Sequence, residues 1–242
     1  MVRLNPKTVY RTLRYAPSLD LVYVMNQKAA CTTIIKSLWL AEDRTRGTNS
    51  YRGAHRHDRG PFINIVDVPR KKLEEAQWFT VVRDPYARLL SAYLDKIVPD
   101  SPPGRWFTQR AGRRPKNFRD FVEKLSHIRM ETMNPHFRAQ YLNVLYPYVR
   151  WDFIGRVEAM DQVSAYLASR GVEMETHSEH ATGAAELLSE HYDDATLARV
   201  TSLYRVDFDL FGYPRRRSPL ETPSLPGPVP ATHEYLLSMA RG

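Results

Sequence analysis

Short apolar runs of strand length, each followed by a helical pattern, are the feature that most constrains the fold of this chain. Leu21–Met25 and Trp78–Val82 are apolar on both faces, as strands of a buried parallel sheet are. Phe62–Val66 and Asp152–Arg156 are further strand candidates. Strands that alternate with helices favour parallel pairing through crossover helices. The sequence therefore predicts an α/β fold with a central parallel sheet flanked by helices.

Helices are predicted where apolar residues recur every three or four positions. The strongest pattern runs from Pro85 to Ile97, with Asp84 as the expected N-cap and Pro85 as the first helical residue. Further helices are expected from Thr33 onward, over Pro69–Ala76, over Phe118–Leu125 with Asn117 as N-cap, over Ala159–Arg170 with Gly171 as its stop, and over Asp194–Val206. Arg44–Gly60 and Pro99–Pro115 are expected to be loops.

The composition predicts one folded domain followed by a tail. The 242 residues suffice for one large α/β domain, or for two small ones. Six of the 17 prolines lie in the segment from Pro214 to Pro230. Arg215–Arg217 add positive charge at the start of this segment. We therefore expect a domain over residues 1–213 and a flexible Pro/Arg-rich tail over residues 214–242, whose end, His233–Met239, has the length of a short docking helix.

The net charge of +8 and the pI of about 9.6 favour an anionic partner, whether nucleic acid, an acidic membrane surface or a phosphorylated small molecule. The single cysteine, Cys31, excludes a disulfide framework and favours a reducing compartment. No apolar run has the length of a signal-peptide core or of a membrane span. We therefore expect a cytoplasmic protein. The sequence does not indicate its oligomeric state.

The loop between the first predicted strand and its helix has features of an anion-binding turn. Small side chains let the backbone approach an anion, and the N–H groups and dipole of a helix N-terminus favour negative charge. Lys28 adds a cation, while the spaced glycines of a Walker A loop are missing. An ordinary turn with a surface lysine is the alternative. The loop residues are Gln27, Lys28, Ala29, Ala30, Cys31, Thr32 and Thr33.

A second polar segment begins where the strand Trp78–Val82 ends. Arg83 follows this strand at the carboxyl edge of the sheet, where open α/β folds bind ligands. Ser91 lies off the apolar stripe of the following helix, so we expect its hydroxyl to be available. Arg83 and Ser91 together offer a phosphate a fork of donors and a hydroxyl. The alternative is that Arg83 and Asp84 form a capping and salt-bridge pair.

Both segments resemble those of a known family, the carbohydrate sulfotransferases that modify chondroitin and the HNK-1 epitope. Gln27–Thr33 is similar to the family's 5′-phosphosulfate loop, Pro-Lys-x-x-Cys-Thr-Asn. Val82–Tyr93 is similar to its 3′-phosphate segment, Val-Arg-Asp-Pro-Phe-Glu-Arg-Leu-Val-Ser-Ala-Tyr. Shorter similarities follow in the same order along the chain at Asn134–Phe137, Asp152–Glu158 and Asp207–Tyr213.

The resemblance implies a P-loop-like three-layer fold and the transfer of a sulfonate group from 3′-phosphoadenosine-5′-phosphosulfate (PAPS) to an acceptor hydroxyl. The acceptor would be a glycan or glycoconjugate such as a glycolipid. The resemblance assigns PAPS binding to Gln27–Thr33, Arg83 and Ser91. Lys28 would neutralise the charge that grows on the leaving phosphate, since such transfers depend on positioning and charge stabilisation.

The chain also departs from the family pattern. Gln27 stands where the family has Pro, Thr33 where it has Asn, and Phe137 where it has Trp. The eukaryotic members carry a Golgi membrane anchor that has no counterpart in this sequence, which implies a cytoplasmic relative. These departures weaken any transfer of acceptor specificity from the family to this chain.

Three side chains compete to be the general base that takes the acceptor's proton. Asp67 lies where related sulfotransferases place a His or Glu, just after the strand that precedes the 3′-phosphate strand. His57, with its neighbour His55, has a suitable ordinary pKa. His136 lies in the Asn-x-His segment, as a base, an acceptor contact or a structural residue. We rank His57 and Asp67 ahead of His136.

No metal is expected, because the pairs His55/His57 and His177/His180 lack a clear third ligand and the chemistry needs none. Cys31 lies near a cationic helix start, which lowers the pKa of a thiol, but packing is its expected role.

Two other functions are open from the sequence. A nucleotide kinase with a divergent phosphate loop would bind ATP with Mg²⁺, although the missing Walker A loop counts against it. A basic nucleic-acid-binding protein is the other alternative, based on the net charge and on the segment Arg105–Lys116, which contains five basic residues with Trp106 and Phe107. The same segment could hold an anionic acceptor, act as a lid or be a solvated loop.

Overall fold

The computed structural model describes residues 12–46, 62–63, 65–175, 183–221, 224 and 229. These residues form two compact units. The first unit holds the described residues up to Val82, those from Asn143 to residue 175, and residue 229. The second unit holds Arg83–Leu142 and the described residues from 183 to 224.

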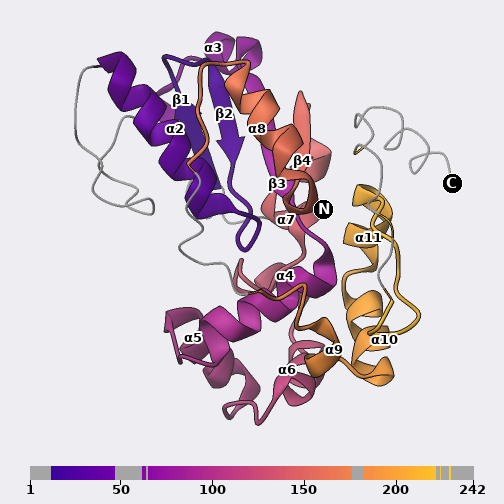
Figure 1. Ribbon diagram of the computed structural model, residues 1–242. Helices are drawn as coiled ribbons and strands as arrows, with labels where there is room; N and C mark the ends of the chain where they lie inside the picture. Colours follow the sequence, from indigo (N-terminus) through magenta and orange to yellow (C-terminus); the bar gives the residue numbers. More distant parts are fainter. Residues whose placement is uncertain are drawn as a thin grey trace, which may run out of the picture. The chain divides into compact units, whose positions relative to one another are not determined.

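The first unit is built on a four-stranded sheet with the strand order β1-β2-β3-β4 (Figure 1). The three strands β2, β3 and β4 pair in parallel, whereas β1 runs antiparallel to β2. The strands are β1 (Leu13–Ala16), β2 (Leu21–Val24), β3 (Gln77–Val82) and β4 (Phe153–Arg156). The α/β prediction is confirmed, with a sheet that is mostly parallel and flanked by helices.

The strand predicted over Phe62–Val66 is wrong. Ile63 makes one isolated bridge to Tyr15, and Ile65–Asp67 form the short 3-10 helix η1. The remaining strand of the sheet is β1, which the sequence pattern did not reveal because Arg14 interrupts its apolar residues. Arg14 is nevertheless buried, and its guanidinium donates to the Leu13 carbonyl at 2.9 Å.

The core of the first unit lies between the sheet and the helices α2 and α8. Tyr23, Phe79 and Val81 lie on one face of β2 and β3, and both helices pack against the cluster that contains them. The rings of Phe153 and Tyr166 stack with their centroids 4.1 Å apart, which fixes α8 on β4. Besides η1, the described helical elements of this unit are α2 (Cys31–Arg46), α3 (Arg70–Glu75), η4 (Tyr146–Tyr148), η5 (Val157–Ala159) and α8 (Met160–Ala168).

The described part of the second unit is helical. Its elements are α4 (Pro85–Ala92), the π-helix η2 (Tyr93–Ile97), α5 (Pro102–Ala111), α6 (Phe118–Leu125), η3 (Met130–Thr132), α7 (Gln140–Asn143, whose last residue is counted with the first unit), α9 (Leu188–His191), α10 (Asp194–Leu203) and α11 (Arg205–Phe211). Buried aromatic rings join them: Phe121 has its centroid 4.8 Å from that of Phe107 and 5.5 Å from that of Phe137.

Two predicted helix starts are confirmed in detail. The Asp84 carboxylate accepts the backbone N–H of Tyr86 at 2.7 Å, with Pro85 in the first turn. The Asn117 side chain accepts the N–H of Asp120 at 2.9 Å at the start of α6.

The loop predicted over Pro99–Pro115 is wrong, because Pro102–Ala111 form α5. Pro102 and Pro103 occupy the first turn, where a missing N–H leaves no helical hydrogen bond unmade. Gly112 ends the helix with a φ of 76°, in the left-handed region that glycine adopts easily. The prolines that indicated a loop therefore begin a helix.

The single helix predicted over Asp194–Val206 is divided. α10 ends at Leu203 and α11 begins at Arg205, with the non-helical Tyr204 between them. Tyr204 is buried, and its hydroxyl donates to the carbonyl of Phe137. This contact gives the break a tertiary cause that helical periodicity cannot show.

Candidate functional site

The loop between β2 and α2 holds two non-glycine residues in the left-handed backbone region. Lys28 has a φ of 68° and Ala30 a φ of 54°. Each such residue costs about 1–2 kcal/mol relative to the right-handed conformation. Alternation of left- and right-handed residues turns successive N–H groups toward one concave side, an arrangement that binds anions. The loop therefore contains positive φ values of the kind found in anion-binding turns, here at non-glycine residues, and the Ala29 N–H donates to the Asn26 carbonyl at 3.3 Å within it.

Buried polar contacts tie the start of this loop to the neighbouring strand. The Asn26 side chain, which is fully buried, donates to the Val81 carbonyl at 3.1 Å. The Thr80 hydroxyl donates to the Val24 carbonyl at 2.8 Å. Because β2 and β3 are parallel, their carboxyl ends share one edge of the sheet. The loop thus begins beside the end of β3. Val81, which accepts the Asn26 hydrogen bond, precedes Arg83 by two residues in the sequence.

The side chains of the loop differ in exposure. Gln27 and Ala29 are buried, whereas Lys28 and Ala30 are half-buried. Cys31, Thr32 and Thr33, at the start of α2, are also half-buried. The cation and the two hydroxyls predicted for anion binding are therefore partly open to solvent at the N-terminus of a 16-residue helix.

Cys31 is not the activated thiol that its cationic neighbourhood would favour. Burial raises the pKa of the Cys31 thiol, and this effect outweighs the hydrogen bonds and positive charge from Lys28 and the hydrogen bonds from Thr32, which lower the pKa. The thiol is therefore protonated near neutral pH, in agreement with a packing role.

In the second unit, the backbone of Arg83 is held by the side-chain amide of Gln140. The Arg83 N–H donates to Gln140 Oε1 at 2.9 Å, and Gln140 Nε2 donates to the Arg83 carbonyl at 2.8 Å. Gln140 is fully buried, whereas the Arg83 side chain is half-buried. This two-point contact positions Arg83 as it emerges from β3.

Asp84 has the capping role expected for it, and its ion pair joins it to the start of the predicted tail. Its carboxylate lies 3.3 Å from the guanidinium of Arg216. The Arg216 backbone N–H also donates to the Tyr86 hydroxyl at 3.3 Å. The expectation of a flexible segment directly after residue 213 is therefore wrong for Arg216, which is packed against the start of α4.

Ser91 does not lie on an open helix face. It is 1% exposed, and every residue from Pro85 to Ala92 is buried. The expectation that its hydroxyl is available is therefore wrong for this structure, since α4 is covered on all sides rather than on one stripe. Its assignment to phosphate binding stays a prediction.

Sequence reasoning missed a buried guanidinium on α4. Arg88 is 1% exposed and donates to the carbonyls of Arg138 at 2.9 Å and Pro135 at 3.0 Å. Burial, with a smaller effect from the charge of Arg88, lowers the pKa of Arg138 to about 10. Arg88 lies inside the family-like segment Val82–Tyr93. Its position in this motif is the one sequence feature that could have indicated its importance.

A buried carboxylate in α11 caps α7. Asp207 accepts the backbone N–H groups of Gln140 at 2.7 Å and Tyr141 at 2.9 Å. Burial raises the pKa of Asp207 to about 6, against the opposing effects of these hydrogen bonds and of the Arg88 charge. Asp207 therefore orders the backbone of Gln140, the residue that holds Arg83.

The three base candidates stand differently in the structure. His57 and its neighbour His55 lie outside the described residues. Asp67 is exposed at the end of η1 in the first unit. His136 is half-buried in the second unit, and its Nδ1 lies 2.8 Å from Asn134 Oδ1. Among the described candidates, His136 alone has a hydrogen bond that orients its side chain.

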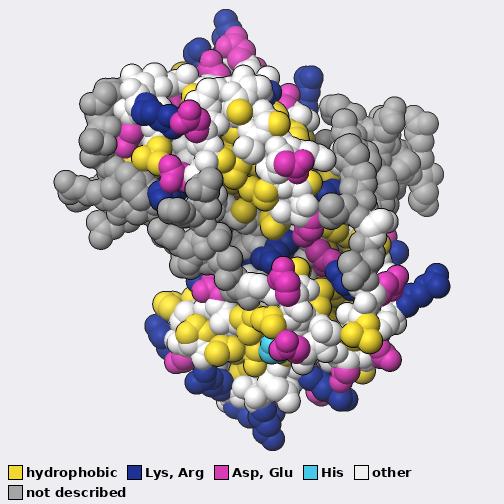
Figure 2. Space-filling view, viewed as in Figure 1, with side chains coloured by type: hydrophobic (Ala, Val, Ile, Leu, Met, Phe, Trp, Pro, Cys, Tyr) yellow, Lys and Arg dark blue, Asp and Glu magenta, His cyan; other side chains and the backbone are white. Residues whose placement is uncertain are grey.

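The basic segment Arg105–Lys116 begins within α5 rather than in a loop. Phe107 is buried in the core, while the basic side chains are exposed. Figure 2 shows Lys and Arg side chains gathered over the part of the second unit that holds α5 and α6. Arg113 pairs with Asp120 at 2.8 Å, and the Arg110 guanidinium lies 5.3 Å from the centre of the Trp106 ring.

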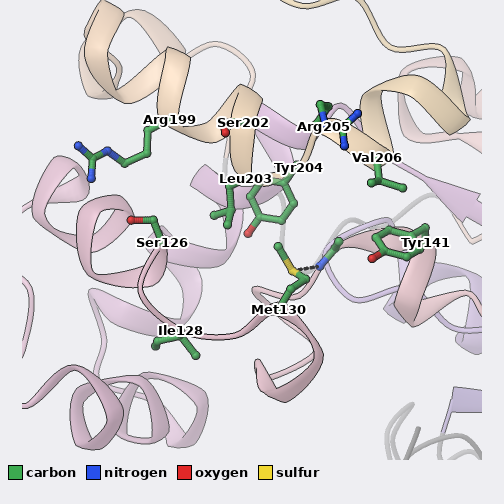
Figure 3. A pocket seen from close by; sticks show the side chains of 11 residues that line it. Ser126, Ile128, Met130, Tyr141, Arg199, Ser202, Leu203, Tyr204, Arg205 and Val206 are labelled. Atoms are coloured by element: carbon green, nitrogen blue, oxygen red, sulfur yellow. Dashed lines mark hydrogen bonds between the residues drawn. The ribbon is translucent and has the colours of Figure 1, made fainter. Parts of the chain in front are cut away.

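A hollow of about 440 Å³ lies in the second unit between α10, α11 and the segment that follows α6 (Figure 3). Arg199 and Ser202 line it together with Met130, whose sulfur accepts the Ala139 N–H at 3.1 Å. Tyr204 forms part of its wall. The predicted site residues do not line this hollow.

The described residues show neither a metal-binding cluster nor a membrane-spanning helix. In this part of the chain, no group of three or more His, Cys, Asp or Glu side chains is placed to hold a metal ion. His177 and His180, like His55 and His57, lie outside it. No helix within the described ranges has the length and apolar character needed to cross a membrane.

The chain is similar in sequence to known carbohydrate sulfotransferases. The chain is 25% identical to carbohydrate sulfotransferase 11 of rat and of mouse over 228 residues, which cover 80% of this chain and 64% of each relative. It is 29% identical to carbohydrate sulfotransferase 14 of zebrafish over 184 residues, or 64% of this chain and 50% of the relative. The chain thus spans less than two thirds of these relatives.

No solved structure is significantly similar to the chain. The sequence profile of the sulfotransferase family matches residues 11–214. This match includes both predicted phosphate-binding segments and the strands that carry them. With most of its length matched, the chain belongs to the sulfotransferase family.

Proposed function

We propose that this chain is a PAPS-dependent sulfotransferase that transfers a sulfonate group to a hydroxyl of a carbohydrate-containing acceptor. The family match supplies the reaction class and implies a sulfonate donor. The names of the rat, mouse and zebrafish relatives support a carbohydrate acceptor. Neither the kinase nor the nucleic-acid-binding alternative finds support in these comparisons. A cytoplasmic location stays a prediction.

The observation that carries this proposal is the strained loop at the carboxyl edge of the sheet. Lys28 and Ala30 adopt positive φ values just before α2, and Asn26 fixes the start of the loop to Val81. These features fit the 5′ end of PAPS, because the N-terminus of a helix and a neighbouring cation stabilise anionic oxygens. Arg83, two residues beyond Val81, is the donor group proposed for the 3′-phosphate.

PAPS supplies the sulfonate and a phosphate leaving group. The chain's own part is to position that group and to neutralise the charge that develops on it. Lys28 is proposed to offset the charge on the phosphate oxygen, with help from the N–H groups at the start of α2. Arg83 is proposed to bind the 3′-phosphate while Gln140 fixes its backbone.

Calorimetric titration of the full chain with PAP, the product nucleotide, and with 5′-AMP, which lacks the 3′-phosphate, tests this assignment. Arg83→Ala should weaken PAP binding by about 10- to 150-fold, the effect of losing one charge-assisted hydrogen bond, and leave 5′-AMP binding unchanged. Lys28→Ala should weaken both. Lys71→Ala, on the exposed side of α3, is the matched control. A wild-type chain that does not bind PAP refutes the proposal.

Turnover with radiolabelled PAPS tests the reaction itself. Unsulfated chondroitin, a glycolipid and a simple phenol form the acceptor panel, and we expect transfer to a carbohydrate. Lys28→Ala should lower turnover by about 100-fold or more, the scale for losing one preorganised donor. Near wild-type turnover in this variant would exclude Lys28 from the reaction.

A further inference from the structure

The segment that follows η3 folds into a turn that fixes one histidine ring. Asn134 Oδ1 accepts the backbone N–H of His136 at 3.1 Å, an Asx-turn with Pro135 at its centre. The Asn134 carbonyl accepts the N–H groups of Phe137 and Arg138, each at 2.9 Å. The turn is thus closed by its own side-chain and main-chain hydrogen bonds.

The same Asn134 oxygen determines the tautomer of the His136 ring. It lies 2.8 Å from His136 Nδ1. Because a backbone N–H only donates, the side-chain atom of Asn134 that faces it is the oxygen rather than the amide nitrogen. That oxygen only accepts, so Nδ1 must carry the proton. In the neutral ring, the lone pair that can take a proton is therefore on Nε2.

Groups from other helices hold this turn in place. The buried Arg88 of α4 donates one N–H to the Pro135 carbonyl and another to the Arg138 carbonyl, on either side of His136. The Tyr204 hydroxyl donates to the carbonyl of Phe137, whose ring is fully buried. The histidine is half-buried on a rigid support, as a catalytic base needs to be.

The turn also leads directly to the residue that holds Arg83. Gln140, four residues after His136, grips the Arg83 backbone through both atoms of its amide. Four residues of chain span at most about 15 Å, so His136 lies within this reach of Gln140. The second unit therefore brings an oriented histidine and the proposed 3′-phosphate arginine onto one connected scaffold.

We propose that His136 is the general base of the reaction and that Asn134 is the residue that positions it. This inference rests on the proposed sulfotransferase function. His136 Nε2 takes the proton of the acceptor hydroxyl while the hydroxyl oxygen bonds to sulfur. The bond from sulfur to the 5′-phosphate oxygen breaks, and its electron pair stays on that oxygen. The proton then leaves His136 for solvent.

Asp67, the other base candidate among the described residues, is not oriented in this way. Asp67 ends a three-residue helix and is exposed, and no hydrogen bond from the described residues orients its carboxylate. This reverses the ranking that the sequence alone favoured.

Nitrogen NMR of the full chain with labelled histidine tests the tautomer without any acceptor. The His136 signals are assigned as those that His136→Gln removes. We expect the neutral ring to be protonated at Nδ1, and Asn134→Ala to shift it toward the Nε2-protonated form, which predominates in free imidazole side chains. A wild-type ring protonated at Nε2 would overturn the inference.

Kinetics with the acceptor that wild type sulfates test the catalytic role. His136→Gln should lower kcat by about 10²- to 10⁴-fold, the usual contribution of a general base, and leave PAP affinity within about twofold of wild type. His127→Gln, an exposed histidine of the same unit, should keep wild-type kcat. Retention of more than about a tenth of kcat in His136→Gln overturns the role of His136.

Conservative variants of Asn134 separate positioning from structure. Asn134→Ala should lower kcat with little change in PAP affinity. Asn134→Asp keeps the acceptor oxygen and should restore most of kcat, with the acid limb of the pH–rate profile moved to higher pH because a carboxylate stabilises the protonated ring. An unmoved profile in Asn134→Asp contradicts the positioning role.

The two proposals fail in different ways. A wild-type chain that binds no PAP and transfers no sulfonate refutes the sulfotransferase function, and the base assignment with it. A wild-type chain that binds PAP and transfers sulfonate, with a His136→Gln variant of similar kcat, refutes the base assignment alone.

Discussion

Asp207 offers a quantitative test of how the second unit supports Arg83. Its buried carboxylate accepts two backbone N–H groups at the start of α7, and burial raises its pKa from the ordinary 3.8 to about 6. The hydrogen bonds and the positive charge of Arg88 reduce this rise without cancelling it. We predict that Asp207→Asn abolishes a pH-dependent loss of stability that the wild-type chain shows.

The sign follows from proton linkage. Between the two pKa values, the folded chain holds the Asp207 proton while the unfolded chain has released it. The free energy of unfolding therefore falls as the pH rises from about 4 to about 6. The rise in pKa corresponds to a total of about 3 kcal/mol, at about 1.4 kcal/mol per pKa unit. About 1.4 kcal/mol of this loss falls between about pH 5 and about pH 7.5.

Equilibrium urea unfolding, followed by tryptophan fluorescence over that pH interval, measures the effect. As the pH rises over this interval, the free energy of unfolding of wild type minus that of Asp207→Asn should fall by about 1.4 kcal/mol. The altered hydrogen bonds of asparagine add an offset that does not change with pH, so they do not affect this fall. Asp209→Asn, on the exposed side of α11, controls for the loss of one negative charge. A difference that stays constant, or that increases with pH, refutes the reasoning.

Three further predictions concern stability and reactivity. Ala30→Gly should raise the free energy of unfolding by up to about 1 kcal/mol, because glycine adopts a positive φ without strain, and a lower melting temperature would contradict this. Gly104→Ala should destabilise the chain by about 1–3 kcal/mol, since a Cβ there would lie 2.1 Å from the Lys96 carbonyl oxygen, and an unchanged melting temperature would argue against that close approach. Cys31 should react with iodoacetamide more slowly than free cysteine at neutral pH, because burial raises its pKa. Mass spectrometry measures both rates, and equal rates would contradict this prediction.

Local signals predicted much of the fold. β3 and α4 follow from an apolar strand, a capping Asp84 and Pro85 at the first helical position, all adjacent in sequence. The pattern failed where the tertiary structure buries a group that usually marks the surface. Arg14 hides β1 in this way, because its guanidinium is buried in the folded chain. Pro102 was misleading because its effect depends on whether it begins or interrupts a helix.

The sequence indicated where the proposed site residues lie in the fold, but not their geometry. The loop after β2 and Arg83 after β3 follow from the order of strands and from their similarity to family motifs. The positive φ values of Lys28 and Ala30 could not be read from residues that rarely adopt them. The partners of Arg83 were also hidden, since Gln140 lies 57 residues away along the chain and spacing patterns report only on near neighbours.

The lack of glycine in the loop after β2 has a consequence for how the chain responds to mild denaturing conditions. Glycine adopts a positive φ without steric strain, whereas in this loop tertiary contacts, among them that between Asn26 and Val81, hold Lys28 and Ala30 in a strained conformation. Local opening of that contact would release the strained backbone while the sheet stays folded. Amide exchange near Lys28 should then precede exchange in β2, so nucleotide affinity would decline with rising urea before any strand is lost.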